Sequence, residues 1–95
     1  MPTITLPHTR LFYAPFLPTD ARQTLLLLHG AGSSHLTWPG ELRRLPQTAV
    51  YALDLPGHGR STPPGRQSVA DYAQDVIQFI AALELKDVVL LGHSM

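Results

Sequence analysis

The last four residues of the chain are of the types that a nucleophilic serine needs. They read Gly92-His93-Ser94-Met95 and follow an apolar run at residues 88–91. A serine hydroxyl is a weak nucleophile, so it must sit exposed on a sharp turn within reach of a general base. A strand that leads into Gly-x-Ser is the sequence pattern of such a turn, and Gly92 would leave room for a following helix. Alone the pattern is weak, because apolar runs before Gly-x-Ser are common.

Two earlier segments also place polar residues and glycines directly after a predicted buried strand. Residues 29–34 read HGAGSS, and residues 54–61 read DLPGHGRS. In open parallel sheets, ligands bind beyond the carboxyl ends of the strands. We therefore expect these two segments and the C-terminal GHSM to meet at one edge of a sheet.

The strands that position these segments can be predicted from hydropathy. Residues 24–28, 48–53 and 87–91 are predicted strands in which apolar and polar residues do not alternate, which is typical of strands covered on both faces in a parallel sheet. Residues 3–6 and 11–14 are short β-prone runs that predict an antiparallel hairpin at the sheet edge. The predicted fold class is α/β, with a mostly parallel sheet and an N-terminal antiparallel hairpin.

The clearest predicted helix begins after Ser68, an N-cap residue with Asp71 three positions later. Its apolar residues recur at helical spacing and form one stripe, and its polar residues face away. The stripe contains Val69, Tyr72, Ala73, Val76, Ile77, Ile80 and Leu83, and the polar set contains Asp71, Gln74, Asp75 and Gln78. Residues 36–45 predict a partly helical crossover that is irregular around Pro39 and Gly40.

Composition excludes several classes of function. Of the 95 residues, 44% are hydrophobic and 15% charged, which is typical of a globular chain. The net charge is zero and the charges are scattered, so there is no basic face for nucleic acid. Cysteine is absent, which excludes disulfides and thiolate chemistry. We see no signal peptide and no apolar run near the ~20 residues of a membrane span, so we expect a cytoplasmic protein.

In order and spacing, the segments LLLLHGAGSS, ALDLPGHGRS and VVLLGHSM resemble the α/β-hydrolase family, most closely its small esterase-like branch. The resemblance covers nearly the whole chain and implies that residues 1–95 are the N-terminal part of one such domain, truncated at the nucleophile elbow. It implies a serine hydrolase of small-molecule carboxylic esters or related acyl substrates, without metal or organic cofactor. Peptidase, thioesterase, carbon–carbon hydrolase, haloperoxidase and lyase activities share these motifs and stay open, as does the oligomeric state.

The resemblance also implies roles for individual residues. Ser94 matches the catalytic nucleophile, and the backbone N–H groups of Met95 and Ala31 match the two oxyanion-hole donors. Such donors stabilise the developing negative charge of the transition state. The residues that match loop-supporting positions are His29, Gly30, Gly92 and His93.

Several other residues in these segments and in the rest of the chain are expected to have structural roles or none that the sequence indicates. We expect His58 and Arg60 to brace their loop and Asp54 to stabilise a turn, because the family's catalytic acid comes from a later strand. Trp38 and Leu36 are expected to pack the crossover, and neither His8 nor His35 carries a usable signal.

The chain order in the family is serine, acid, histidine, so the acid and the base would both follow residue 95. We therefore expect the 95-residue chain alone to be inactive as a hydrolase. We also expect it to be marginally stable and prone to aggregation, because its last strand would be an unpaired edge.

Two alternatives stay open. Gly30-x-Gly32 after a strand, with Asp54 ending the next strand, imitates a dinucleotide-binding βαβ unit, although His35 stands at the third glycine position. A catalytically dead fragment or a small-molecule-binding module of the same fold is the second alternative, because fold does not fix function.

Overall fold

The structure of the chain, a computed structural model, describes residues 2–7, 9–30, 32–61, 65 and 68–92. Within these residues the strands are β1 (Thr3–Thr5), β2 (Arg10–Phe16), β3 (Gln23–Leu28), β4 (Thr48–Leu53) and β5 (Val88–Gly92). The helical elements are a short 3₁₀ helix, η1 (His35–Thr37), and the α-helices α1 (Gly40–Arg43) and α2 (Val69–Ala82). The predicted crossover after β3 is therefore partly helical, as expected.

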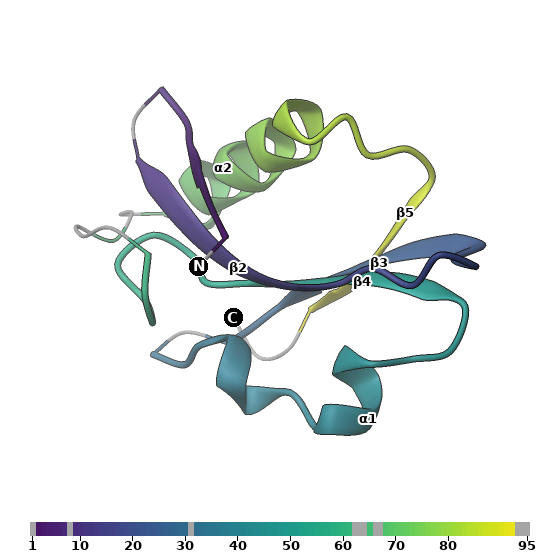
Figure 1. Cartoon of the computed structure of the whole chain (residues 1–95). Coiled ribbons are helices and arrows are strands. Elements are labelled where there is room, and N and C mark those ends of the chain that lie inside the picture. Colours follow the sequence, from purple (N-terminus) through teal and green to yellow (C-terminus); the bar gives the residue numbers. More distant parts are fainter. Residues whose placement is uncertain (1, 8, 31, 62–64, 66–67, 93–95) are drawn as a thin grey trace.

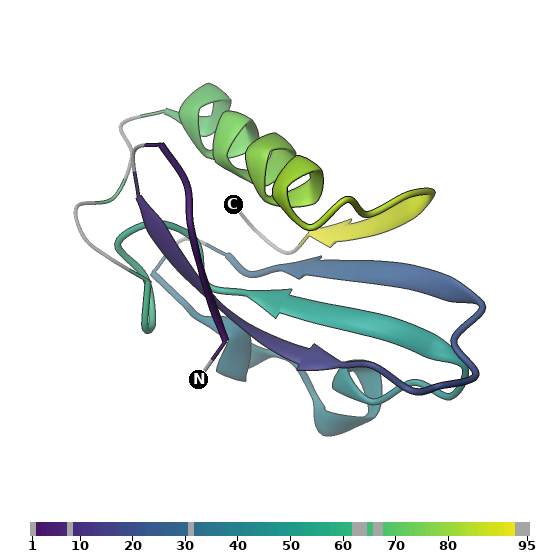
Figure 2. The same ribbon diagram turned by 45° about the horizontal axis from the view of Figure 1, so that its top comes forward.

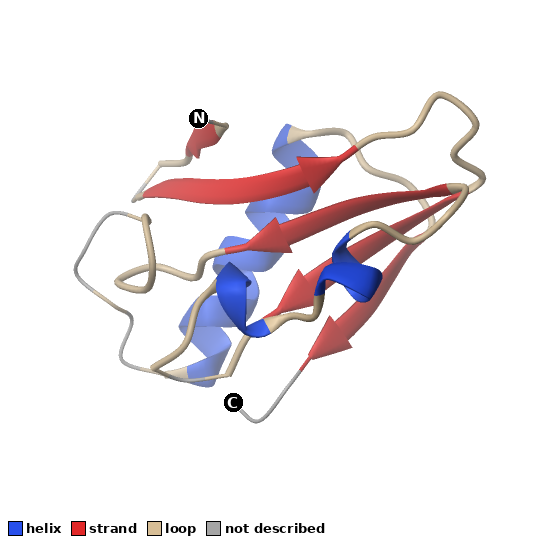
Figure 3. Cartoon of the chain, turned by 60° about the horizontal axis from the view of Figure 1, so that its bottom comes forward, coloured by secondary structure: helices blue, strands red, loops and turns tan. Residues whose placement is uncertain are grey.

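The strands form one twisted sheet in the order β1-β2-β4-β3-β5 (Figure 2). β1 and β2 form the antiparallel hairpin at one edge, and β2 is also antiparallel to β4. β3 pairs in parallel with both β4 and β5, so the arrowheads of these three strands point the same way in Figure 3. The sheet confirms the predicted α/β fold class.

Helices cover both faces of the sheet, with α2 on one side and η1 and α1 on the other (Figure 1). Leu26 of β3 joins the core under α2 together with Phe79. Its neighbours Leu25 and Leu27 join the opposite core, which contains Trp38. Both faces of β3 are therefore buried, which explains its unalternated apolar run. Each fully buried leucine stabilises the fold by about 1.5–3 kcal/mol.

The two residues that were expected to pack in the crossover, Trp38 and Leu36, differ in burial. Trp38 is buried against the sheet, as expected, whereas Leu36 is 68% exposed, so its predicted packing role is wrong. The Ser34 hydroxyl caps the N-terminus of η1 by accepting the Leu36 N–H at 3.2 Å. This short 3₁₀ turn directs the Leu36 side chain away from the sheet.

α2 begins where predicted, but its buried face is rotated from the predicted stripe. The Ser68 hydroxyl accepts the Asp71 N–H at 3.2 Å and caps the helix. Phe79, outside the predicted stripe, is fully buried, and so is Asp75, which was expected to face away. The reason is that α2 leans toward β2 and β4, where the Phe79 ring meets Tyr13 and Tyr51 edge-on. Its other apolar side, which carries Val69 and Ile77, is exposed.

β5 is the least covered strand among the described residues. Val89 and Leu90 are each more than half exposed although they lie on opposite faces of the strand. Among the described strands, only β3 pairs with β5. In the described part of the chain, no helix has the length and apolar character that a membrane crossing requires.

Candidate active site

The three sequence segments singled out above begin side by side at one edge of the sheet. Leu28, the last residue of β3, is in register with Leu53 of β4 and with Gly92 of β5. The strands β3, β4 and β5 therefore end at the same level, and the segments that begin at His29 and Asp54 leave the sheet there. Neighbouring strands lie about 4.8 Å apart, so the outer two segments begin only ~10 Å from each other.

His29 links the first segment to the second. Its ring is buried and uses both nitrogens: Nδ1–H donates to the Gly30 carbonyl at 2.7 Å, and Nε2 accepts the Leu55 N–H at 3.0 Å. This pattern requires the neutral Nδ1–H tautomer. Burial lowers the pKa of His29 below its usual 6.5, because the protonated ring would lose its hydration. His29 therefore holds backbone in place and has no free nitrogen to serve as a base.

His58 makes the reverse connection, from the second segment to the first. Its Nε2 accepts the Gly32 N–H at 3.0 Å, and its Nδ1–H donates to the Pro56 carbonyl at 3.0 Å. The rings of His58 and His29 lie against each other with centroids 4.9 Å apart. Each loop thus contributes one imidazole that accepts a backbone N–H of the other loop.

A buried Asp54–His35 pair, which sequence reasoning missed, lies beside these loops. The Asp54 carboxylate is fully buried and accepts the His35 backbone N–H at 2.6 Å and its Nδ1–H at 2.9 Å. The Arg60 N–H donates to the other oxygen, Oδ2, at 2.9 Å. Asp54 thereby stabilises its turn, as expected. No local signal could have paired it with His35, because the contact joins η1 to the end of β4.

Ser61 and Gly59 complete the support of the second loop. The buried Ser61 hydroxyl accepts the Phe12 N–H at 2.9 Å and donates to the Asp54 carbonyl, which ties the loop to β2. Gly59 has a φ of +52°, and a Cβ there would lie 2.6 Å from Asp54 Oδ1 and closer still to Oδ2. Only glycine therefore fits over the carboxylate.

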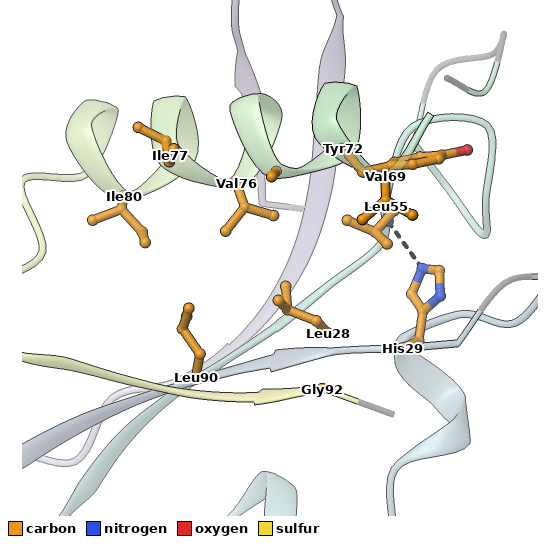
Figure 4. A pocket seen from close by; sticks show the side chains of 11 residues that line it. Leu28, His29, Leu55, Val69, Tyr72, Val76, Ile77, Ile80, Leu90 and Gly92 are labelled. Carbon is orange, nitrogen blue, oxygen red and sulfur yellow. Dashed lines mark hydrogen bonds between the residues drawn. The ribbon is translucent and has the colours of Figure 1, made fainter. Parts of the chain in front are cut away.

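An apolar cavity of about 420 Å³ opens next to this edge, between α2 and β5 (Figure 4). Ile77 and Ile80 of α2 line it from one side, and Leu28 and Leu90 of the sheet line it from the other. Gly92 lies at its end, and a Cβ on Gly92 would meet nothing within 4 Å. The helix expected to pass close to Gly92 is thus not among the described elements.

Several predicted site residues lie outside the described residues. These are Ala31, His93, Ser94 and Met95. The structure describes three of the predicted loop-support residues, namely His29, Gly30 and Gly92, and places them at the common edge of the sheet. Among the described histidines and acidic residues, no cluster could hold a metal ion.

The geometry argues against a dinucleotide site. The carboxylate of Asp54, which would have to bind a ribose, is buried and engaged by His35 and Arg60. The loop that contains Gly32 leads into the three-residue η1 and not into a long helix whose N-terminus could hold a pyrophosphate.

Comparisons with known proteins agree with the fold. The model of the alpha/beta hydrolase family matches residues 25–95. An uncharacterised protein of Mycobacterium tuberculosis is 33% identical over 96 residues, which cover 99% of this chain and 28% of that protein. A pimeloyl-[acyl-carrier protein] methyl ester esterase of Yersinia pestis is 40% identical over 72 residues, covering 75% of this chain and 26% of the esterase.

A solved structure shows the same arrangement. A hypothetical protein of Pseudomonas aeruginosa PAO1 superposes with a TM-score of 0.81 and 32% identity, over 97% of this chain and 33% of that chain. The chain thus spans between a quarter and a third of the length of these relatives.

Proposed function

Because the chain belongs to the alpha/beta hydrolase family, we propose that it is the N-terminal part of a serine hydrolase of carboxylic esters or related acyl substrates. The observation that carries this proposal is the common register of Leu28, Leu53 and Gly92. It brings the ends of three parallel strands together, and a nucleophile after β5 would therefore lie next to the loop after β3. Acyl transfer needs this arrangement, with a nucleophile and oxyanion donors around one carbonyl.

Ser94 is the proposed nucleophile, two residues after the end of β5. The backbone N–H groups of Ala31 and Met95 are the proposed oxyanion donors, with His93 supporting the turn. Two such donors in a site shielded from water stabilise the tetrahedral intermediate, and removal of one typically slows turnover about 10²–10³-fold. His29 and Gly30 would support the first donor, and Gly92 would support the turn that carries the nucleophile.

The general base is proposed to come from outside residues 1–95. Both ring nitrogens of His29 and of His58 are engaged with backbone groups. His35 holds the buried Asp54 carboxylate at the foot of the loops. A serine without a base is not deprotonated during attack, so residues 1–95 alone are proposed to be inactive.

The proposed substrate class is taken from the name of a similar protein. The similar Yersinia protein is named for hydrolysis of a methyl ester, and we carry over only the ester class. The substrate would be a small molecule, and acyl transfer through serine needs no cofactor. A cytoplasmic setting is also proposed, and the absence of cysteine is compatible with such a reducing compartment.

The test uses the full-length product of the reading frame that encodes residues 1–95, treated with a fluorophosphonate probe and then assayed with p-nitrophenyl acetate. We expect one labelled serine, identified as Ser94 by peptide mass spectrometry, and loss of labelling and turnover in Ser94→Ala. Ser34→Ala is the matched control, because Ser34 caps η1 in the neighbouring loop and should label normally. Equal labelling of Ser94→Ala, or a label on another serine, would overturn the proposal.

A further inference from the structure

The loops after β3 and β4 are joined by two imidazole rings that lie against each other, those of His29 and His58. The ring centroids are 4.9 Å apart. The His29 Nε2 accepts the Leu55 N–H at 3.0 Å, the contact drawn in Figure 4. The His58 Nε2 accepts the Gly32 N–H, also at 3.0 Å. Both of these contacts between the loops therefore depend on an unprotonated Nε2.

The two rings are held in the same tautomer. In each ring the Nδ1–H donates to a carbonyl of its own loop, from His29 to Gly30 at 2.7 Å and from His58 to Pro56 at 3.0 Å. A protonated imidazole is a donor at both nitrogens and has no acceptor. Protonation of either ring would therefore place an N–H opposite the backbone N–H of the other loop, and that contact would be lost.

Titratable and charged side chains next to the pair come from several elements of the described structure. They are Asp54 at the end of β4, His35 of η1, Arg60 of the loop after β4 and Tyr72 of α2. Burial lowers the pKa of His29, and a positive charge on His58 or His35 opposes its protonation further. The Gly30 carbonyl and the Asp54 carboxylate act the other way, but the net effect is a lowered pKa. The Asp54 carboxylate is itself held by the His35 Nδ1–H.

We propose that His29 and His58 together form a pH-sensitive switch, which joins the loops after β3 and β4 when both rings are neutral and releases them when the rings are protonated. Each protonation moves one proton from the solvent to Nε2 and breaks no covalent bond of the chain. Two charged rings in contact would also repel each other. The released state thus binds more protons, so its population rises as the pH falls. Imidazoles titrate between about pH 5 and 8, and the change should fall in this range. The switch does not depend on the proposed function.

The test follows hydrogen exchange in the full-length product by ¹H–¹⁵N NMR at pH 7.5 and at pH 5. Each rate is divided by the rate of an unstructured chain at the same pH, which gives a protection factor. We expect the protection of the Gly32 and Leu55 amides to fall roughly tenfold or more at pH 5. The Asp54 amide is the internal control and should keep its protection, because it donates to the Phe12 carbonyl at 3.0 Å. No loss, a loss at only one of the two amides, or an equal loss at Asp54 would overturn the proposal.

Two single variants assign the effect to the rings. Glutamine has an oxygen that can accept the same backbone N–H, but its amide gains no proton in this pH range. In His58→Gln, the Gly32 protection at pH 5 should stay within about twofold of its value at pH 7.5, and in His29→Gln the same should hold for Leu55. A fall in a folded variant as large as in the wild type would contradict the role of the ring that was replaced. If a variant does not fold, the wild-type comparison decides the proposal by itself.

Discussion

Replacement of Gly59 by alanine should destabilise the chain more than the same change at Gly32. A Cβ at this position would lie 2.6 Å from Asp54 Oδ1, far inside van der Waals contact. The carboxylate cannot move aside freely, because it is buried and accepts hydrogen bonds from His35 and from the Arg60 N–H.

The size of the effect follows from two costs. A residue with a Cβ at the φ of +52° of Gly59 costs about 1–2 kcal/mol. Displacement of the Asp54 carboxylate breaks at least one hydrogen bond to a charged group, about 1.5–3 kcal/mol more. Gly32→Ala is the matched control: Gly32 also has a positive φ, +77°, but a Cβ there would meet nothing within 4 Å. The two variants should differ in free energy of unfolding by at least about 1.5 kcal/mol.

Urea unfolding followed by tryptophan fluorescence measures this difference. Trp38 is the single tryptophan and is buried against the sheet, so its emission reports on the native packing. With a urea m-value of roughly 1.5 kcal/mol/M, the Gly59→Ala midpoint should lie about 1 M or more below that of Gly32→Ala. If Gly59→Ala is already unfolded without urea while Gly32→Ala is folded, this result also supports the prediction. Equal midpoints would refute the packing of Gly59 against Asp54.

Two further predictions concern a buried imidazole and the core. Because burial lowers the pKa of His29, its contribution to stability should be complete above pH 6.5 and decline as the pH falls below 6.5. His29→Gln should flatten this loss between pH 7.5 and 5 in urea titrations, and an equally steep loss in the variant would contradict it. Phe79→Ala should cost about 3–5 kcal/mol, because the ring is fully buried. Ile77→Ala, on the exposed side of α2, should cost less than about 1 kcal/mol, and equal costs would show that the helix is rotated differently.

The common edge at which β3, β4 and β5 end was predictable, whereas the contacts between the loops after β3 and β4 were not. Residues 24–28 and 48–53 lack polar alternation, so a parallel sheet and the edge at which ligands bind follow from sequence. The Asp54–His35 pair joins side chains from different elements, and no local pattern of the sequence encodes such a contact. The sequence therefore carries no signal for His35, although this residue holds a fully buried carboxylate.

The rotation of α2 was missed for a different reason. The apolar arc of this helix is wide, and periodicity alone does not decide which part of a wide arc meets the sheet. Contacts of Phe79 with Tyr13 and Tyr51 decide it, and they depend on β2 and β4 lying side by side. The predicted roles of Ser94, Met95, Ala31 and His93 stay proposals, because these residues lie outside those that the structure describes.

The place of β3 between β4 and β5 has a consequence for the order in which the fold can form. Both of its partner strands follow it in the chain. Leu25 of β3 can pair only after Val50 of β4 has been synthesised on one side, and much later Val89 of β5 on the other. Most of the sheet is thus built from pairings between distant parts of the sequence, and such topologies fold slowly because long loops must close before contacts compensate. During synthesis on the ribosome, β3 can pair with β4 early, but its other edge stays open until β5 has emerged. Of the strands that have a neighbour on both sides, β3 is therefore the last whose pairing is completed.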